Sequence, residues 1–434
     1  MGKRIFSKKS RWEPGLFAII VGITAVLAII IGGPYLLSKT REAFPVSVTV
    51  NTDGLEILQT AYASVAQGSY EDALAHIRPL LKGRDPLITP RAIMLEADIL
   101  HLQGHPDKAL ENLSVACDKF TNSPEYPYLQ ARKARQLEEM GKFAESKEIY
   151  ESIRDHAPAE IRALGYLGLA RLEQRAENFV AARDLARLAV DDSPWGTTVW
   201  NEAVDMLGPL NVALIFSPQE TPESKIYTVE KGDNLNSIGI KLNTTQGLLM
   251  EANSITEPEK LSLGQRLKYT PKDFSIVIER STCSLFLMDN KGIFKRYKTG
   301  LGKPGHETNL GKYTIGTKQK DPVWHKPGAG PIPANAPDNE LGTRWMPLEP
   351  ADEGLPRDLG IHGTIAPDTI GSFASKGCAR MHNEEVEELY DLVVRATPVE
   401  ILESLNPSAA QDPASSPDPA PATNEDTSSE EAAA

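Results

Sequence analysis

Two short stretches, Ile361-His362-Gly363-Thr364 and Ser375-Lys376-Gly377-Cys378-Ala379-Arg380-Met381, decide how the C-terminal part of this chain is interpreted. A cysteine follows a histidine by 16 positions, and an arginine comes two places after the cysteine. These residue types can supply a general base, a nucleophile and an anion-binding group. The spacing predicts two adjacent strands that carry His362 and Cys378 side by side.

The predicted chemistry starts from the thiol of Cys378. A free cysteine has a pKa near ~8.5, so little of it is thiolate at neutral pH without help from neighbours. We expect His362 to take the thiol proton and to return it to a leaving amine. In an extended stretch Arg380 shares a face with Cys378, where it could stabilise the thiolate or pair with a substrate carboxylate.

Neighbouring groups complete the predicted site. The carbonyl of Gly377, or the hydroxyl of Thr364 or Ser375, is expected to orient the imidazole. Backbone N–H groups of residues 377–379 are the candidates for an oxyanion hole.

A lone cysteine can also be simply a small buried hydrophobic residue. That interpretation suits Cys117 and Cys283, which lie in apolar periodic segments, whereas Cys378 lies in a Ser-Lys-Gly-Cys turn. Three scattered cysteines are too few for a disulfide framework or a zinc site, and we expect no metal or cofactor.

Length and charge limit the possible classes of protein. A chain of 434 residues predicts two to four modules. The net charge of -13 argues against a nucleic-acid-binding protein. Residues 405–434 are rich in Pro, Ala, Ser, Asp and Glu, which predicts a disordered acidic tail.

The N-terminus predicts a membrane anchor. A basic segment, residues 1–15, precedes residues 16–37, which carry no charge. At ~1.5 Å per residue, a helix of this length spans a hydrocarbon core of ~30 Å. The segment could instead be a cleaved signal peptide, but the apolar run is long and Ser38-Lys39-Thr40 is a poor cleavage site. We therefore expect one transmembrane helix with the rest of the chain on the extracytoplasmic side.

Residues 53–194 contain a repeat. Small residues recur at intervals of 36 or 37 positions, each after a turn-forming stretch. The pattern resembles tetratricopeptide repeats and implies an all-α solenoid of paired helices. Such a region either binds a protein partner or spaces the modules on either side of it. The small residues are Ala73, Ala109, Ser146 and Ala182.

A connector, residues 195–224, leads to a small module at 225–271. Within the connector, Leu210–Phe216 suits a buried strand or packing against the last repeat. The pattern of the small module predicts a strand, two short helices and a returning strand. Asp233 or Asn234 is the predicted N-cap of the first helix.

The motifs Val-Glu-Lys-Gly-Asp-Asn-Leu and Leu-Gly-Gln-Arg-Leu in this module resemble those of LysM domains. The resemblance implies a β-α-α-β fold that binds glycans containing N-acetylglucosamine, such as peptidoglycan. The candidate glycan-binding residues are Gly232, Asp233, Asn234 and Asn253.

Residues 272–404 alternate as a mainly-β domain does. One helix is predicted from Asn383, as N-cap, to about Val394. The Pro- and Gly-rich composition of residues 319–357 predicts one long loop. Loops of that length are often lids over an active site. Strands are predicted at 275–279, 284–288, 293–299, 312–317 and 397–402.

The pattern His-Gly-Thr…Ser-x-Gly-Cys-x-Arg-Met in this domain resembles the signature of the L,D-transpeptidase (YkuD-type) family. Thr308–Ile315 and Asn339–Met346 resemble two further family motifs. The chain departs from the family at Asn309 and Glu340, where proline is usual, and at Lys376, where histidine is common.

The family resemblance implies that Cys378 attacks a peptidoglycan stem peptide, releases D-alanine and transfers the acyl group to a second stem. Water or a protein lysine as acceptor would make the enzyme a carboxypeptidase or an anchoring enzyme. A cysteine peptidase or amidase is a rival interpretation, which the His-before-Cys order disfavours. A non-catalytic peptidoglycan-binding scaffold is another. Expected partners are stem peptides and glycan strands.

Overall fold

The computed structural model describes residues 51–156, 158–325, 328, 330–334 and 336–406. It divides into two compact units, one ending at Pro222 and the other beginning at Glu223. The predicted basic segment and anchor, and the tail from residue 407, lie outside the described residues. Among the helices that are described, none is both long and apolar enough to cross a membrane.

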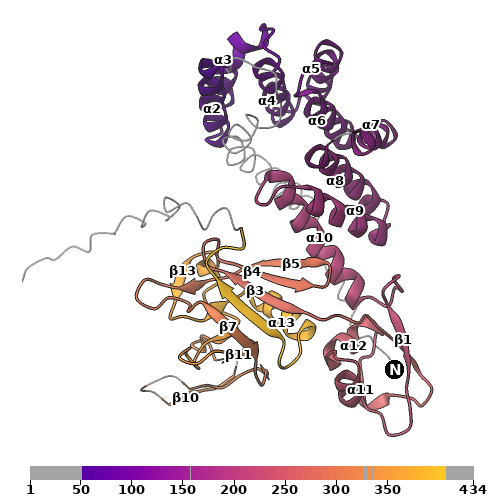
Figure 1. Ribbon diagram of the computed structural model, residues 1–434, viewed down its shortest axis with the longest axis vertical. Helices are drawn as coiled ribbons and strands as arrows, with labels where there is room; N and C mark the ends of the chain where they lie inside the picture. Colours follow the sequence, from indigo (N-terminus) through magenta and orange to yellow (C-terminus); the bar gives the residue numbers. More distant parts are fainter. Residues whose placement is uncertain (1–50, 157, 326–327, 329, 335, 407–434) are drawn as a thin grey trace, which may run out of the picture. The chain divides into compact units, whose positions relative to one another are not determined.

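The first unit is a series of helices, as the periodicity predicted (Figure 1). The four small residues of the repeat are completely buried. A left-handed residue precedes each of them by several positions, at Gly68, Gly104, Gly141 and Glu177. The helices are α2 (Thr52–Ala66), α3 (Tyr70–Leu81), α4 (Ile88–Leu102), α5 (Pro106–Lys119), α6 (Tyr126–Glu139), α7 (Phe143–His156), α8 (Ala159–Arg175), α9 (Phe179–Asp192) and α10 (Thr198–Phe216).

Helix α10 occupies most of the stretch that we expected to be a connector. The Thr197 hydroxyl caps its start by accepting from the Trp200 N–H. Leu210 and Leu214 are buried, so the apolar run 210–216 is the last part of this helix and not a strand.

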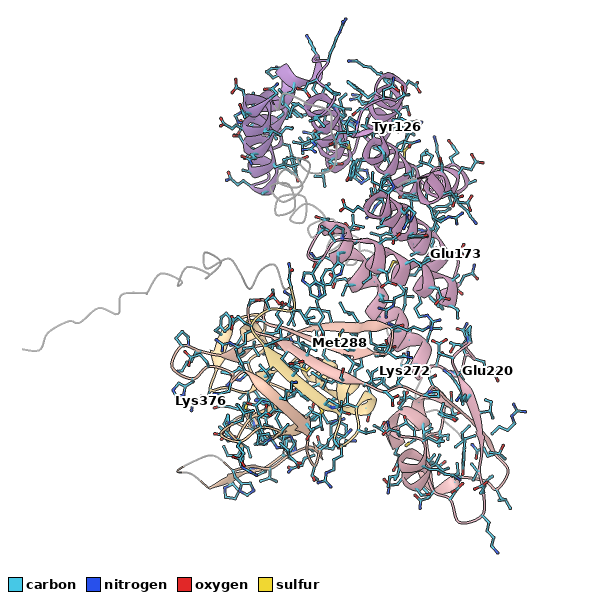
Figure 2. The ribbon with its side chains drawn as sticks, in the orientation of Figure 1. Tyr126, Glu173, Glu220, Lys272, Met288 and Lys376 are labelled. Carbon is cyan, nitrogen blue, oxygen red and sulfur yellow. The ribbon has the colours of Figure 1, made fainter. Side chains whose placement is uncertain are left out.

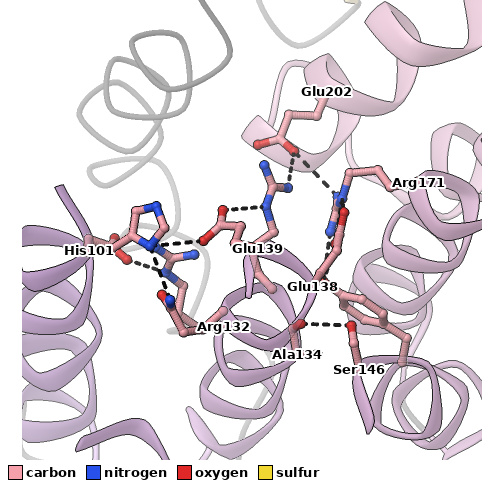
Figure 3. Close-up of polar contacts among 12 residues, drawn as sticks. His101, Arg132, Ala134, Glu138, Glu139, Ser146, Arg171 and Glu202 are labelled. Atoms are coloured by element: carbon pink, nitrogen blue, oxygen red, sulfur yellow. Dashed lines mark hydrogen bonds and ion pairs between the residues drawn. The ribbon is translucent and has the colours of Figure 1, made fainter. Parts of the chain in front are cut away.

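A buried polar network links helices of this unit (Figure 3). Arg171 of α8 pairs with Glu138 of α6 at 3.1 Å and donates to the Tyr150 hydroxyl of α7 at 2.8 Å. These contacts join three successive helices, and the polar groups satisfy one another. Because these groups are paired with one another, the network fixes the packing of the helices.

The second unit begins with the predicted β-α-α-β module. Strands β1 (Lys225–Thr228) and β2 (Arg266–Tyr269) form an antiparallel pair, with α11 (Leu235–Lys241) and α12 (Gln246–Ala252) between them in sequence. The core is formed by buried apolar side chains: Val229, Leu235, Ile238, Leu249 and Leu267.

The rest of the second unit is built on one nine-stranded sheet of order β14-β12-β11-β7-β15-β3-β4-β5, with β8 paired to β11 (Figure 1). All five predicted strands are present. The strands are β3 (Ser275–Glu279), β4 (Ser284–Asp289), β5 (Gly292–Lys298), β7 (Gly311–Ile315), β8 (Gln319–Lys320), β11 (Arg344–Pro350), β12 (Gly360–His362), β14 (Ala379–Arg380) and β15 (Pro398–Leu402).

Smaller elements surround this sheet. Helix α13 (Asn383–Leu392) contacts β11 and β12. Two small pairs lie outside the main sheet: β9 (Trp324–His325) is antiparallel to β10 (Pro331–Ile332), and β6 (Leu301–Gly302) is parallel to β13 (Phe373–Ser375). Short 3-10 turns occur at Pro258–Lys260 and Pro367–Thr369.

Two predictions in this domain are wrong in detail. The stretch 319–357 is not one loop, because β11 runs through it as an interior strand of the sheet. The N-cap of α13 is His382 and not Asn383, and the helix ends at Leu392. The Asn383 side chain instead joins two segments of the candidate site.

Candidate active site

Parallel pairing of β12 and β14 brings the two motif stretches together. His362 pairs with Arg380 in register, and Cys378 directly precedes β14. The Arg380 backbone is fixed further by two hydrogen bonds to Gly300, of 2.8 and 2.9 Å. The pairing therefore places His362 opposite Arg380, two residues after Cys378.

The turn before Cys378 is braced by Ser375. The Ser375 hydroxyl donates to the Cys378 carbonyl at 2.7 Å and accepts from the Gly377 N–H at 3.1 Å. Gly377 has φ +119, and an added Cβ would lie 3.1 Å from Leu359. Ser375 therefore shapes the turn and does not orient the imidazole, and the Gly377 N–H is already used. Lys376 points outward from this turn (Figure 2).

The ring of His362 is held from two sides. Its Nδ1 lies 2.7 Å from the Gly363 carbonyl, so this carbonyl, and not that of Gly377, orients the imidazole. The Glu340 backbone lies close enough to raise the pKa of the ring. Trp345 of β11 packs beside it, with ring centroids 5.7 Å apart. Thr364 has a structural role, because its hydroxyl accepts from the Ala366 N–H.

Burial sets the charge state of both groups. It is the main cause that lowers the pKa of His362 to about 4; the Gly363 carbonyl opposes this decrease and nearby Arg380 contributes to it. Burial raises the pKa of the Cys378 thiol to about 11, although the residue as a whole keeps partial exposure. The Gly360 backbone and Arg380 oppose that increase in the thiol pKa. At neutral pH the resting pair is therefore an uncharged thiol and an uncharged imidazole.

The resting thiol points to backbone groups. Its Sγ donates to the Asp358 carbonyl at 3.7 Å. Within the described residues, no hydrogen bond joins the thiol to the imidazole. Proton transfer between the two side chains therefore requires a rotation of the thiol away from Asp358.

Arg380 meets a carboxylate that the sequence did not lead us to expect. Its Nη2 lies 3.4 Å from Oε2 of Glu340, which belongs to the segment before β11. The Nε of Arg380 is buried and has no partner among the described residues. The guanidinium therefore keeps unused hydrogen-bonding capacity.

Asn383 is a scaffold residue that sequence reasoning missed. Its Oδ1 accepts from the N–H groups of Thr343 and Thr364, and its Nδ2 donates to the Thr364 carbonyl. These contacts tie the segment before β11 to the loop after His362. The polar side chain directly after Met381-His382 was the available signal, but it suggested a helix cap.

Three of the four candidate glycan-binding residues of the small module make internal hydrogen bonds. Asp233 accepts from the Tyr227 hydroxyl at 2.7 Å and from the Glu230 N–H at 2.9 Å. Asn234 forms a reciprocal capping box with Ser237 at the start of α11. Asn253 bonds both backbone groups of Lys268 in β2. Gly232, at φ +93, forms the turn.

The two remaining cysteines are buried, as expected for structural residues. Burial raises the pKa of Cys117 and of Cys283. Cys378 is the candidate nucleophile because it alone of the three is partly exposed, and because it directly precedes the strand that pairs with the strand of His362.

Two parts of this chain are similar to known protein families. Residues 273–401 match the model of the L,D-transpeptidase catalytic domain, and residues 227–270 match that of the LysM domain. A Bacillus subtilis protein named "Putative L,D-transpeptidase YkuD" is 32% identical over 183 residues, which cover 40% of this chain and 97% of that protein. A second B. subtilis protein, "Putative L,D-transpeptidase YqjB", is 34% identical over 31% of this chain and 73% of its own length. The chain belongs to the YkuD-type L,D-transpeptidase family.

Proposed function

We propose that this protein is a peptidoglycan L,D-transpeptidase that cross-links stem peptides through an acyl-enzyme on Cys378. The observation that carries the proposal is the pairing of β12 with β14, which places His362 opposite Arg380, two residues after Cys378. In this reaction Sγ attacks the carbonyl before the terminal D-alanine, the C–N bond breaks, and a thioester remains.

The resting charge state favours one order of events. Because the thiol pKa lies far above the imidazole pKa, a preformed thiolate–imidazolium pair is unfavourable. We infer that the proton moves to His362 as the S–C bond forms, and then passes to the departing amine of D-alanine. The Gly363 carbonyl stabilises the imidazolium that forms in this step.

The oxyanion of the tetrahedral intermediate needs hydrogen-bond donors. The Gly377 N–H donates to Ser375, so we assign this role to the Cys378 N–H. The Ser375 hydroxyl bonds the Gly377 N–H and the Cys378 carbonyl, and so braces the backbone on both sides of the Cys378 N–H.

The remaining modules suit an enzyme of the cell wall. We propose that residues 225–271 bind glycan strands, mainly through backbone groups and exposed edges, since Asp233, Asn234 and Asn253 are engaged internally. We propose that the helices of residues 53–194 are tetratricopeptide-like repeats that either bind a protein partner or space the domains. The absence of charge in residues 16–37 supports a membrane anchor, with the enzyme on the extracytoplasmic side.

The test of the activity uses the full chain in detergent with purified disaccharide-tetrapeptide. We expect mass spectrometry to detect a cross-linked dimer that has lost D-alanine. Tripeptide without dimer would shift the assignment to a carboxypeptidase. No product at all would favour the non-catalytic scaffold.

A further inference from the structure

Glu340 and Arg380 form an ion pair in the candidate active site. Its contacts suit a ligand-binding site better than a structural ion pair. The contact is a single long one, 3.4 Å, and the two side chains are 15% (Arg380) and 39% (Glu340) exposed. A structural arginine is usually saturated with hydrogen bonds, yet the Nε of Arg380 is buried without a partner in the described part of the chain. A buried unsatisfied donor costs roughly 1–3 kcal/mol, so its retention calls for a functional reason.

The backbone that carries Glu340 is held firmly. The buried side chain of Asn339 donates to the carbonyls of Pro322 and Pro333 and accepts from the Leu341 N–H. Asn383 binds the next part of the segment at Thr343. Because the turn is fixed, the position of the Glu340 carboxylate is defined to within its own side-chain rotations.

The segment that contains Glu340 also lies near the general base, His362. The Glu340 backbone lies close enough to the imidazole of His362 to raise its pKa, while the Glu340 carboxylate pairs with Arg380. One residue thus lies near both the general base and the cationic side chain.

We propose that Glu340 and Arg380 together bind the zwitterionic α-amino-acid group of the acceptor. The acceptor carboxylate pairs with the Arg380 guanidinium, and its amino group donates to the Glu340 carboxylate. Because both side chains have unused capacity, they can bind the two charges of the acceptor together. Glu340 is then a specificity-determining residue for the second half of the reaction. This inference rests on the proposed transpeptidase function.

The transfer step conserves atoms and charge. The ammonium group of the acceptor first loses one proton to solvent. Its nitrogen then attacks the thioester carbonyl, the C–N bond forms and the C–S bond breaks. A second proton passes from nitrogen to His362 and on to the departing sulfur, so that thiol and neutral imidazole are regenerated. Glu340 orients the amine and takes no part in the proton balance.

The test separates acylation from transfer in the full chain. The donor is disaccharide-tetrapeptide, and the acceptor probes are D-methionine and D-methioninamide, which lacks the carboxylate. Mass spectrometry measures D-alanine release for acylation and the D-methionine adduct against free tripeptide for transfer. For the wild type we expect half-maximal transfer at about tenfold lower concentration for D-methionine than for its amide.

Glu340→Gln removes the charge at nearly constant size. It should raise the half-maximal D-methionine concentration about tenfold and increase hydrolysis, with a clearly smaller change in the rate of D-alanine release. Glu340→Asp should recover most of the lost acceptor affinity. Glu353→Gln, a change at an exposed carboxylate of the same domain, is the matched control and should behave as the wild type.

Two outcomes overturn the inference while leaving the proposed function intact. One is unchanged transfer in Glu340→Gln. The second is an equal loss of acylation and transfer, which would make Glu340 a positioning residue for the nucleophile. If the wild type releases no D-alanine, the proposed function itself fails, and this inference fails with it.

Discussion

The LysM module and the site around Cys378 contain equally prominent polar motifs, but they use them differently. In the module, Asp233, Asn234 and Asn253 are engaged in internal hydrogen bonds. At the site, Arg380 keeps a buried Nε with no partner in the described chain, and the pKa values of Cys378 and His362 are both displaced by burial. Internally bonded polar residues point to folding, whereas unsatisfied or titration-shifted ones point to chemistry.

The largest effect expected from this contrast is at His362. His362→Ala should lower the rate of acylation about 10²- to 10⁴-fold, because the resting thiol is protonated and needs a base. D-alanine release measures the rate, and binding to isolated sacculi is the control for the LysM module. A loss of less than tenfold would mean that another group takes the thiol proton.

Asn253→Ala probes the LysM side of the comparison. It removes hydrogen bonds between the end of α12 and β2, so it should destabilise the module by about 1–3 kcal/mol. The rate of acylation of a small donor should not change. Thermal unfolding and sacculus binding measure the two properties, with Lys231→Ala as an exposed control. Lost binding at unchanged stability would instead make Asn253 a glycan contact.

The pH profile of acylation should be broad. The His362 imidazole, with its pKa lowered to about 4, stays neutral as pH falls until that value is approached. The Cys378 thiol, with its pKa raised to about 11, stays protonated until pH is high. Acylation should therefore vary less than about twofold from about pH 6 to about pH 9. A change in the acylation rate with its midpoint at about pH 6.5, the usual histidine pKa, would contradict the buried neutral pair.

Lys376→His should have the smallest effect. The substitution introduces the residue that is common in the family at an exposed position beside Cys378. Because the Lys376 side chain is exposed and Ser375 braces the turn, acylation and stability should each change by less than about twofold. A clear increase in acylation would show that the family histidine assists the nucleophile.

The sequence allowed prediction of the parts whose pattern is local. Strands such as 275–279, the β-α-α-β module and the pairing of the two motif stretches follow from alternation, turn residues and spacing. The short strands β12 and β14 were predicted from their His and Cys motifs. With three and two residues respectively, they are too short to show a hydrophobic periodicity.

The parts that were missed depend on contacts between distant segments. Glu340 and Arg380 are 40 positions apart, and no local pattern predicts their ion pair. The Gly363 carbonyl orients the imidazole because of backbone geometry, which residue identity does not reveal. Asn383 was expected to cap a helix. Its long-range hydrogen bonds to Thr343 and Thr364 were missed because they depend on tertiary structure.

The most direct test of the proposed mechanism compares the full chain with its Cys378→Ala variant on disaccharide-tetrapeptide, read by mass spectrometry. We predict D-alanine release, a thioester on the wild-type chain and a cross-linked dimer, with none of the three in the variant. Equal products from both proteins, or cross-linking without a thioester on Cys378, would contradict a cysteine acyl-enzyme.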